Sequence, residues 1–293
     1  MKLLNFYSDS GIAMGLVEGD QVFNLTSASG NNPAFASVGA WLRSGDTSSS
    51  NIRALRDQLK TSNTASVPFA TLQHASMMER DARVFCVGLN YADHAAENNL
   101  PPPESPIFFP KFAAVVIPHL AEIPLPSISD QIDYEAEFVV VIGQTADRVS
   151  EKEAHACIAG YSIMNDVSAR DMQRLDKQWF RAKNCNGFGP LGPWMVTADD
   201  VPDPLTLDIA LRLNGETLQK SNTSNLVFSP AALISFLSQT LVLEPGDIIS
   251  TGTPAGIGSM RRPQIFLKDG DRVEIEVSSI GILENVVASA KPK

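Results

Sequence analysis

The spacing of apolar positions changes near residue 78 and divides the chain into two parts. The first part opens with three short apolar runs that favour strands, at 1–7, 11–19 and 21–25. Apolar residues then recur with helical spacing over Phe35–Leu42 and Ile52–Leu59. This order predicts a small N-terminal α+β domain over residues 1–78.

The second part, residues 79–293, consists of many short apolar segments separated by Gly and Pro turns. The predicted strands are 84–89, 107–109, 138–142, 160–164, 194–197, 205–213, 247–250, 272–277 and 282–287. One helix is predicted to open at Ser150, which begins a capping box, and another at Ser229, which precedes Pro230. Because strands and helices do not alternate regularly, we expect a β-rich α+β domain with a sandwich-like or barrel-like core.

Composition narrows the functional class. The formal net charge is -10, whereas a nucleic-acid-binding surface is basic, so nucleic acid is not an expected partner. No apolar run reaches the roughly 18–20 residues that cross a bilayer, so no membrane partner is expected either. The three cysteines form no pairing pattern, which is typical of a reducing compartment. We therefore expect a cytoplasmic protein.

Two glutamates enter a strongly apolar strand. Glu135 and Glu137 alternate with apolar residues just before the run Phe138–Ile142, so they lie on one face of the strand. A third acid, Asp166, ends another apolar strand. Buried carboxylates repel one another unless a cation compensates them, and oxygen-only ligands suit Mg²⁺ or Mn²⁺, with Ca²⁺ also compatible. The alternative is two exposed glutamates on an edge strand and an unrelated helix-capping aspartate.

A histidine and a glutamate form a candidate general-base pair. If the segment after the strand 84–89 is helical, His94 and Glu97 are i and i+3 neighbours, so Glu97 can bond one imidazole nitrogen. The other nitrogen is then free to take a proton from water. The alternative is an ion pair on an exposed helix face.

Further candidates are polar residues in apolar or Gly-rich surroundings. Lys111 and Lys183 could each hold a substrate carboxylate or an enolate oxygen, although most lysines are simply solvated. Arg170 and Gln173 follow Asp166 on what should be a short helix. Thr253 lies in a tight turn that lacks the Gly-Lys-Ser/Thr of a phosphate-binding loop and leaves its backbone N–H groups available to a ligand.

Taken together, these segments resemble the fumarylacetoacetate hydrolase family. They occur in the family's order and cover residues 81–290 of the chain. The matching segments are Gly88–Glu97, Phe109–Phe112, Asp133–Gly143, Asn165–Gln173, Gly189–Pro193 and Glu244–Gly256. One departure is the run after Lys183, Asn-Cys-Asn-Gly, where many relatives carry Ser-Phe-Asp, so the resemblance does not specify the substrate.

The resemblance implies a mixed β-sandwich roll, commonly a homodimer, with one Mg²⁺ or Mn²⁺ held by Glu135, Glu137 and Asp166. It also implies that His94 and Glu97 activate water and that Lys183 stabilises an enolate. Lys111 remains a candidate substrate contact, and the resemblance places Arg170, Gln173 and Thr253 at substrate-contact positions.

The reaction that the resemblance implies is hydrolytic C–C cleavage of a small keto acid, of acylpyruvate or 2,4-diketo acid type. The alternatives on the same scaffold are an oxaloacetate-type decarboxylase, a hydroxymuconate-type isomerase and, from another class, a catalytically silent metal-binding protein.

Overall fold

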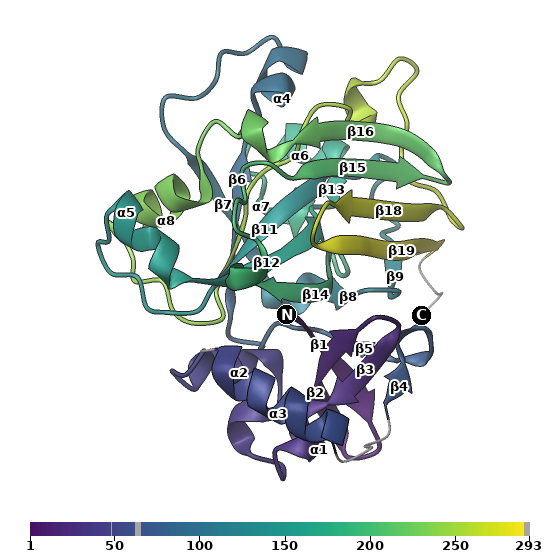
Figure 1. Cartoon of the computed structure of the whole chain (residues 1–293). Coiled ribbons are helices and arrows are strands. Elements are labelled where there is room, and N and C mark those ends of the chain that lie inside the picture. The colour runs from purple at the N-terminus through teal and green to yellow at the C-terminus, as the bar shows by residue number, and fades with distance from the viewer. Residues whose placement is uncertain (48, 62–65, 290–293) are drawn as a thin grey trace.

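The computed structural model describes residues 1–47, 49–61 and 66–289. Figure 1 shows a broad sheet that runs through the molecule, with a smaller sheet packed on it and helices at the periphery. Within the described residues the large sheet contains β1 (Lys2–Ser8), β2 (Gly11–Glu18), β3 (Gln21–Asn24), β4 (Val67–Pro68), β5 (His74–Ala75), β6 (Arg83–Gly88), β7 (Ile107–Phe112), β8 (Val116–Pro118), β11 (Ala136–Ile142), β12 (Ile158–Asn165), β14 (Gly189–Thr197) and β17 (Ile248–Ser250).

The second sheet contains β9 (Glu122–Leu125), β15 (Asp208–Leu213), β16 (Glu216–Asn222), β18 (Arg272–Val277) and β19 (Gly281–Ser289), and a small ladder joins β10 (Ile132–Asp133) to β13 (Ser168–Ala169). Most strand pairs are antiparallel, but β8 with β14, β6 with β17 and β9 with β19 are parallel. The fold is therefore β-rich α+β with mixed sheets and no closed barrel, which confirms the expected class.

The helices are short. They are α1 (Leu25–Ala28), α2 (Val38–Arg43), α3 (Ser49–Thr61), α4 (Ala92–Glu97), α5 (Glu151–Ala154), α6 (Arg170–Asp176), α7 (Phe180–Lys183) and α8 (Pro230–Ser238). Ser150 caps α5 in a complete capping box, and Ser229 caps α8, whose first residue is a proline. Both predicted helix starts are confirmed.

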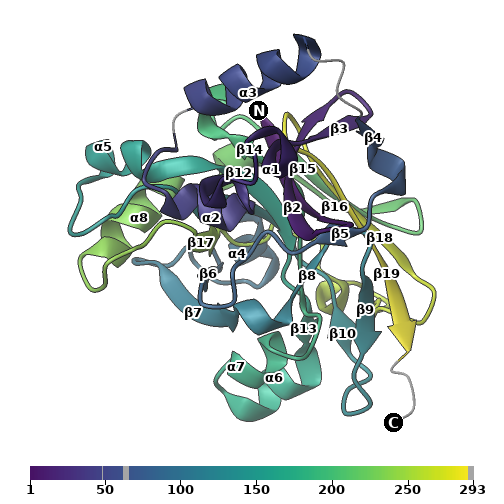
Figure 2. The same ribbon diagram turned by 90° about the horizontal axis from the view of Figure 1, so that it is seen from below.

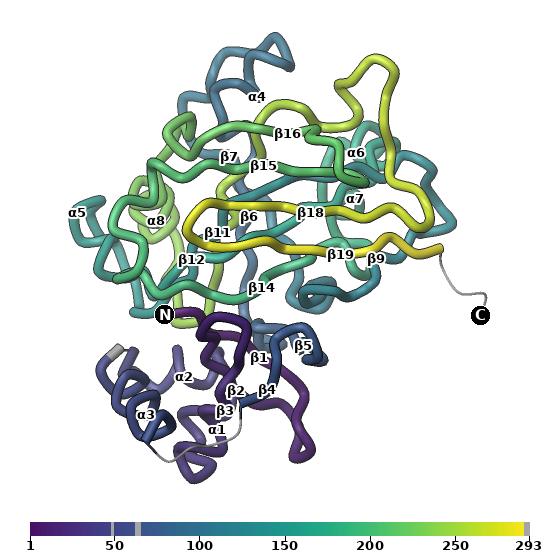
Figure 3. Tube along the Cα trace, turned by 45° about the vertical axis from the view of Figure 1, so that its right-hand side comes forward, coloured from purple at the N-terminus to yellow at the C-terminus, as the bar shows by residue number. Residues whose placement is uncertain are grey.

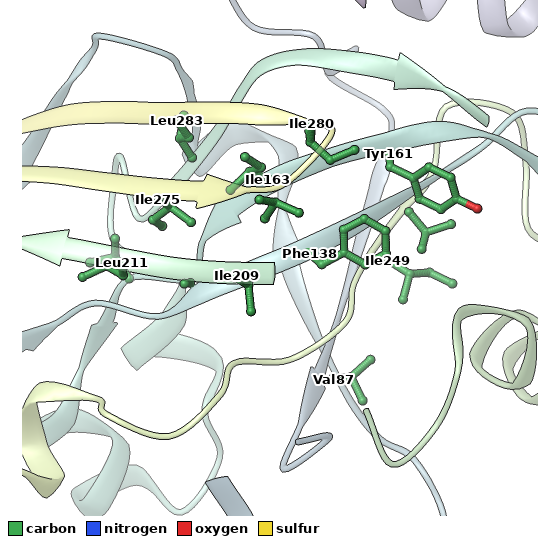
Figure 4. Packing of buried hydrophobic residues seen from close by; sticks show 14 of the residues in the cluster. Val87, Phe138, Tyr161, Ile163, Ile209, Leu211, Ile249, Ile275, Ile280 and Leu283 are labelled. Atoms are coloured by element: carbon green, nitrogen blue, oxygen red, sulfur yellow. The ribbon is translucent and has the colours of Figure 1, made fainter. Parts of the chain in front are cut away.

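Strand β11 forms the centre of the core, and every one of its residues is buried. Phe138, Val140 and Ile142 pack with residues of the second sheet, while Val139 and Val141 face the opposite side. Phe138 stacks on Tyr161 with ring centroids 5.1 Å apart, as Figure 4 shows. Two covered faces explain why this run is apolar at every position instead of alternating with polar residues.

The N-terminal segment supplies the cover on that opposite side. Side chains of α2 and α3 pack with the β11 residues that point away from the second sheet. Strand β1 joins β14 only through Lys2 and Leu3, so the lobe made by residues 1–78 continues the large sheet at one edge (Figures 2 and 3). The domain boundary at 78 stays a prediction, because sheet pairing crosses between the two parts.

Candidate metal centre and active-site pocket

Three acidic side chains meet where β11 and β12 lie side by side. Ala136 pairs with Asn165 in the ladder, so Glu135 and Asp166 both lie at the same end of these strands, beside Glu137. Each offers one oxygen, and these oxygens lie within 4.8 Å of one another. All three residues are buried. The structure thus brings the three predicted ligands together, and the alternative of exposed edge-strand glutamates is wrong.

The electrostatics of this cluster favour a bound cation. Burial, and then the charges of Asp166 and Glu135, raise the pKa of Glu137 well above that of an ordinary glutamate. Asp166 Oδ1 has no hydrogen-bond partner among the described residues, although Lys111 Nζ lies 2.9 Å away. A compact set of hard oxygen donors with this unsatisfied atom fits Mg²⁺, Mn²⁺ or Ca²⁺.

Lys183 reaches into the cluster from the end of α7. Its Nζ donates to Glu135 Oε2 at 2.6 Å and to Asp166 Oδ2 at 2.7 Å. Burial works to lower the pKa of Lys183, but the charges of Asp166 and Glu135 raise it above the usual lysine range. The ammonium therefore stays protonated, and it can donate to an oxyanion but cannot act as a base.

Lys111 lies beside the acidic cluster. Its fully buried Nζ is 2.9 Å from Asp166 Oδ1, and neither residue belongs to the lining of the cavity. Its Nζ also donates to the carbonyl oxygens of Phe188 and Lys183. Lys111 therefore compensates the acidic cluster in this structure, and its role as a substrate contact stays a prediction.

The His94–Glu97 pair forms as predicted on α4. His94 Nδ1 lies 3.2 Å from Glu97 Oε2. Glu97 is itself held by the Gly256 backbone N–H, which donates to Glu97 Oε1 at 3.0 Å. With Nδ1 bonded to the carboxylate, Nε2 is the nitrogen that can exchange a proton with a ligand, and its nearest polar neighbour is Asn98 Nδ2 at a long 3.5 Å.

Arg170 is bound on both sides by acids. Its Nε donates to Asp133 Oδ2 at 2.8 Å, and a terminal nitrogen donates to Glu135 Oε1. Another donates to Gln173 Oε1 at 3.0 Å. Burial works against the charge, but Glu135 and Asp133 raise the pKa of Arg170. Arg170 and Gln173 were predicted site residues, whereas Asp133 was not, although its position beside the Glu-x-Glu pair was an available signal.

Several of these groups line one pocket of about 370 Å³. Thr253 also lines it and accepts a hydrogen bond from Gln219, a buried residue that the sequence analysis did not identify. The residues that contribute polar groups to the wall include His94, Glu135, Glu137, Arg170, Gln173, Arg174, Lys183, Thr253 and Gln264. Most of the predicted site residues thus line a single cavity. Asp166 and Glu97 do not line it but bond to Lys183 and His94, which do, and Lys111 pairs with Asp166.

Comparison with known proteins agrees with this geometry. Residues 83–288 match the model of the fumarylacetoacetate (FAA) hydrolase C-terminal family. The chain belongs to this family. It is 44% identical over 237 residues to the mitochondrial oxaloacetate tautomerase FAHD2A of Bos taurus, which covers 80% of this chain and 74% of that protein.

Solved structures of the family have the same fold. A 5-carboxymethyl-2-hydroxymuconate delta-isomerase from Mycobacterium smegmatis superposes with a TM-score of 0.77 and 33% identity, covering 100% of both chains. A maleylpyruvate hydrolase from Sphingobium sp. SYK-6, in complex with manganese(II) and pyruvate, superposes with a TM-score of 0.79 and 28% identity, covering 99% of this chain and 100% of that one. The family thus includes hydrolases, isomerases and tautomerases that share this scaffold.

Among the described residues, no helix combines the length and apolar character needed to cross a membrane.

Proposed function

We propose that the protein is an Mg²⁺- or Mn²⁺-dependent enzyme that forms the enolate of a small keto acid, and that its reaction is the keto–enol tautomerisation of an oxaloacetate-type dicarboxylate. The observation that carries the proposal is the presence, in the lining of one pocket, of a buried protonated lysine, Lys183, and a carboxylate-bound histidine, His94. The resemblance to an oxaloacetate tautomerase over most of the chain supports the reaction class.

The residues divide the chemistry between them. Glu135, Glu137 and Asp166 would hold the cation, and a divalent cation at such a site supplies Lewis-acid polarisation of keto and carboxylate oxygens. Lys183 donates to the oxygen on which negative charge develops. In the direction of the enol, His94 takes a proton from the adjacent carbon, Glu97 stabilises the imidazolium that results, and the proton then passes to the enolate oxygen. Conversion of the enol to the keto form runs the same steps in reverse.

The cations at the wall support a dicarboxylate substrate. Arg170 and Arg174 both belong to α6 and line the cavity, although the chain as a whole is acidic. A guanidinium is well suited to bind carboxylate oxygens in pairs. Arg174 lies at the exposed rim of the pocket, where it can meet the second carboxylate of a substrate whose first end reaches the acidic cluster.

Hydrolytic C–C cleavage of an acylpyruvate or 2,4-diketo acid is the second candidate, and the His94–Glu97 pair favours it because the same base can deliver water to a carbonyl carbon. Decarboxylation and isomerisation use the same enolate and remain alternatives. A cytoplasmic location also stays a prediction, since the bovine relative is a mitochondrial protein.

The test compares His94→Ala with Lys183→Met on two substrates, enol-oxaloacetate and acetylpyruvate, with Mg²⁺ or Mn²⁺ present. Lys183→Met should abolish both reactions, because both need the oxyanion donor. His94→Ala should lower turnover by at least about 100-fold, the lower range of general-base effects.

Lys152→Met, which changes an exposed lysine of α5, is the matched control and should behave as wild type. Wild-type enzyme that accelerates neither reaction with either ion would contradict the proposed function. Cleavage of acetylpyruvate without tautomerisation of oxaloacetate would make the second candidate the better one.

A further inference from the structure

The segment 251–259, which runs from the end of β17 into the 3-10 turn Gly258–Met260, binds acidic side chains with its backbone. Five of its N–H groups donate to four acidic side chains from different positions in the chain. The prediction that the backbone N–H groups of this turn are available to a ligand is therefore wrong for these five groups. The bonds are Gly252 N to Glu137 Oε2 at 3.2 Å, Ala255 N to Asp93 Oδ1 at 3.4 Å, Gly256 N to Glu97 Oε1 at 3.0 Å, and Gly258 N and Ser259 N to Asp133 at 2.8 and 3.0 Å.

Two of these acids, Asp93 and Glu97, belong to α4, the helix that carries His94. A helix of six residues is not stable by itself, and Tyr91 at its start gives no side-chain cap. Its position therefore depends on tertiary contacts. Figures 1 and 3 show α4 at one extremity of the molecule, next to the β16 side of the second sheet.

Asp93 makes the contact that joins α4 to the second sheet. Ser221 Oγ, on β16, donates to Asp93 Oδ2 at 2.6 Å. Ser221 in turn accepts from Asn225 Nδ2 at 3.0 Å, which orients the hydroxyl hydrogen toward Asp93. Asp93 does not line the pocket. The Glu97–Gly256 bond and the Asp93–Ser221 bond hold the helix at two points one turn apart.

We propose that Asp93 and Ser221 are positioning residues that hold α4 in the orientation in which the His94 imidazole faces the keto-acid pocket. The inference rests on the proposed function of His94 as a base. The fraction of molecules with α4 in place sets the fraction that can transfer the proton, so the bond acts on turnover through His94 alone. Neither residue contacts the metal-binding carboxylates.

The main variant is Ser221→Ala, which removes the hydroxyl and leaves Asp93 in place. We expect kcat on enol-oxaloacetate to fall about tenfold, the scale of one lost hydrogen bond to a charged group, with little change in KM or in the apparent affinity for Mn²⁺. Ser221→Thr keeps the hydroxyl and should restore turnover. In a His94→Ala background, Ser221→Ala should have no further effect, because its route of action is already gone.

The matched control is Ser37→Ala. It removes another hydroxyl bonded at 2.6 Å to a carboxylate, that of Glu79, which does not line the pocket. It should lower stability without lowering kcat. Wild-type kcat in Ser221→Ala, or an equal loss in the wild-type and His94→Ala backgrounds, would overturn the proposal.

Hydrogen exchange separates this inference from the proposed function. The α4 amides should exchange faster in Ser221→Ala than in wild type, and not in Ser37→Ala, whatever the substrate proves to be. If the wild-type enzyme turns over neither keto acid but α4 loses protection in Ser221→Ala, the proposed function fails while the positioning contact stands. Unchanged protection of α4 overturns the contact itself.

Discussion

Seven buried charged residues lie in or beside the pocket, and six of them form ion pairs with one another. Four are acids and three are bases, so the acids remain in excess. They are Asp133, Glu135, Glu137 and Asp166, with Lys111, Arg170 and Lys183. Among the described residues, Glu137 is the member of this set with no direct bond to a basic side chain. Burying an unpaired carboxylate is costly, and for this reason the pKa of Glu137 is raised.

This excess of buried acids predicts that removing one acid weakens metal binding without lowering the stability of the metal-free protein. Glu137→Gln should weaken Mg²⁺ or Mn²⁺ binding by at least about a hundredfold, because one direct charge contact with the cation is lost. The same change removes repulsion among buried acids, so the unfolding midpoint of chelator-treated protein should not fall. Calorimetric titration and thermal unfolding with a chelator present check both halves.

Metal affinity equal to that of wild type in Glu137→Gln would contradict the assignment of Glu137 as a ligand. A lowered midpoint in the chelator-treated variant would contradict the repulsion among the buried acids.

At the scale of elements, the loop 251–259 depends on glycine where other backbone approaches closely. Gly256 has φ +104°, and a Cβ there would lie 2.2 Å from the Leu218 carbonyl oxygen, on the edge strand β16. The tight approach is what lets the Gly256 N–H reach Glu97. The loop thus joins the second sheet, α4 and the acidic cluster through contacts that leave no room for a side chain.

Gly256→Ala should therefore destabilise the fold more than its backbone conformation alone explains. The matched control is Gly270→Ala, which also has positive φ, +84°, but meets nothing within 4 Å. We expect the control to cost about 1–2 kcal/mol and Gly256→Ala clearly more, with loss of turnover as Glu97 shifts. Urea unfolding and kinetics on both variants provide the measurement, and equal costs would argue against the close approach.

At the scale of the molecule, aromatic rings join the N-terminal lobe to the large sheet. His74 of the lobe packs edge-on against His119, with ring centroids 4.9 Å apart, and Phe69 packs against Trp194 at 5.1 Å. Burial lowers the pKa of His74 to about 4 and, with the neighbouring His74, that of His119 to about 3. Both rings are therefore neutral in the folded protein at neutral pH.

The two neutral, buried histidines predict a loss of stability in mild acid. The unfolded histidines bind protons near pH 6.5, well above their folded pKa values, so the unfolded state binds more protons as pH falls from about 6.5 toward 4. The free energy of unfolding should fall across that window. His74→Phe, which cannot titrate, should flatten the dependence in urea unfolding at pH 7.5, 5.5 and 4.5, and a slope equal to that of wild type would contradict this account.

Association is the other property of the whole molecule. We expect a homodimer, as the family resemblance implied, and the exposed Phe112 and Phe180, which pack on each other with centroids 5.3 Å apart, provide apolar surface that a partner could cover. Sedimentation at micromolar concentration should give twice the 31.6 kDa chain mass. A monomeric mass would contradict the prediction.

Local pattern determined much of the fold and of the site. The unbroken apolar run of β11 specified a strand covered on both faces, and the helix-capping serines placed the starts of α5 and α8. The His94–Glu97 contact followed from helical spacing, and the metal cluster from acids at strand ends. These features depend on the period of apolar residues along the chain and on neighbours within a few residues. Both can be read directly from the sequence.

Only the tertiary structure decided the rest. Strand β16 is polar at most positions, so it lacks an apolar pattern, and its pairing with β15 brings Gln219 and Ser221 to the site. The ion pair of Lys111 with Asp166 joins residues 55 positions apart, which the sequence pattern did not indicate. Asp133 meets Gly258 across 125 positions of the chain. Such contacts depend on which sheets pack together. Each contact joins residues that are distant in the chain, so it becomes favourable only when the whole core has formed around it.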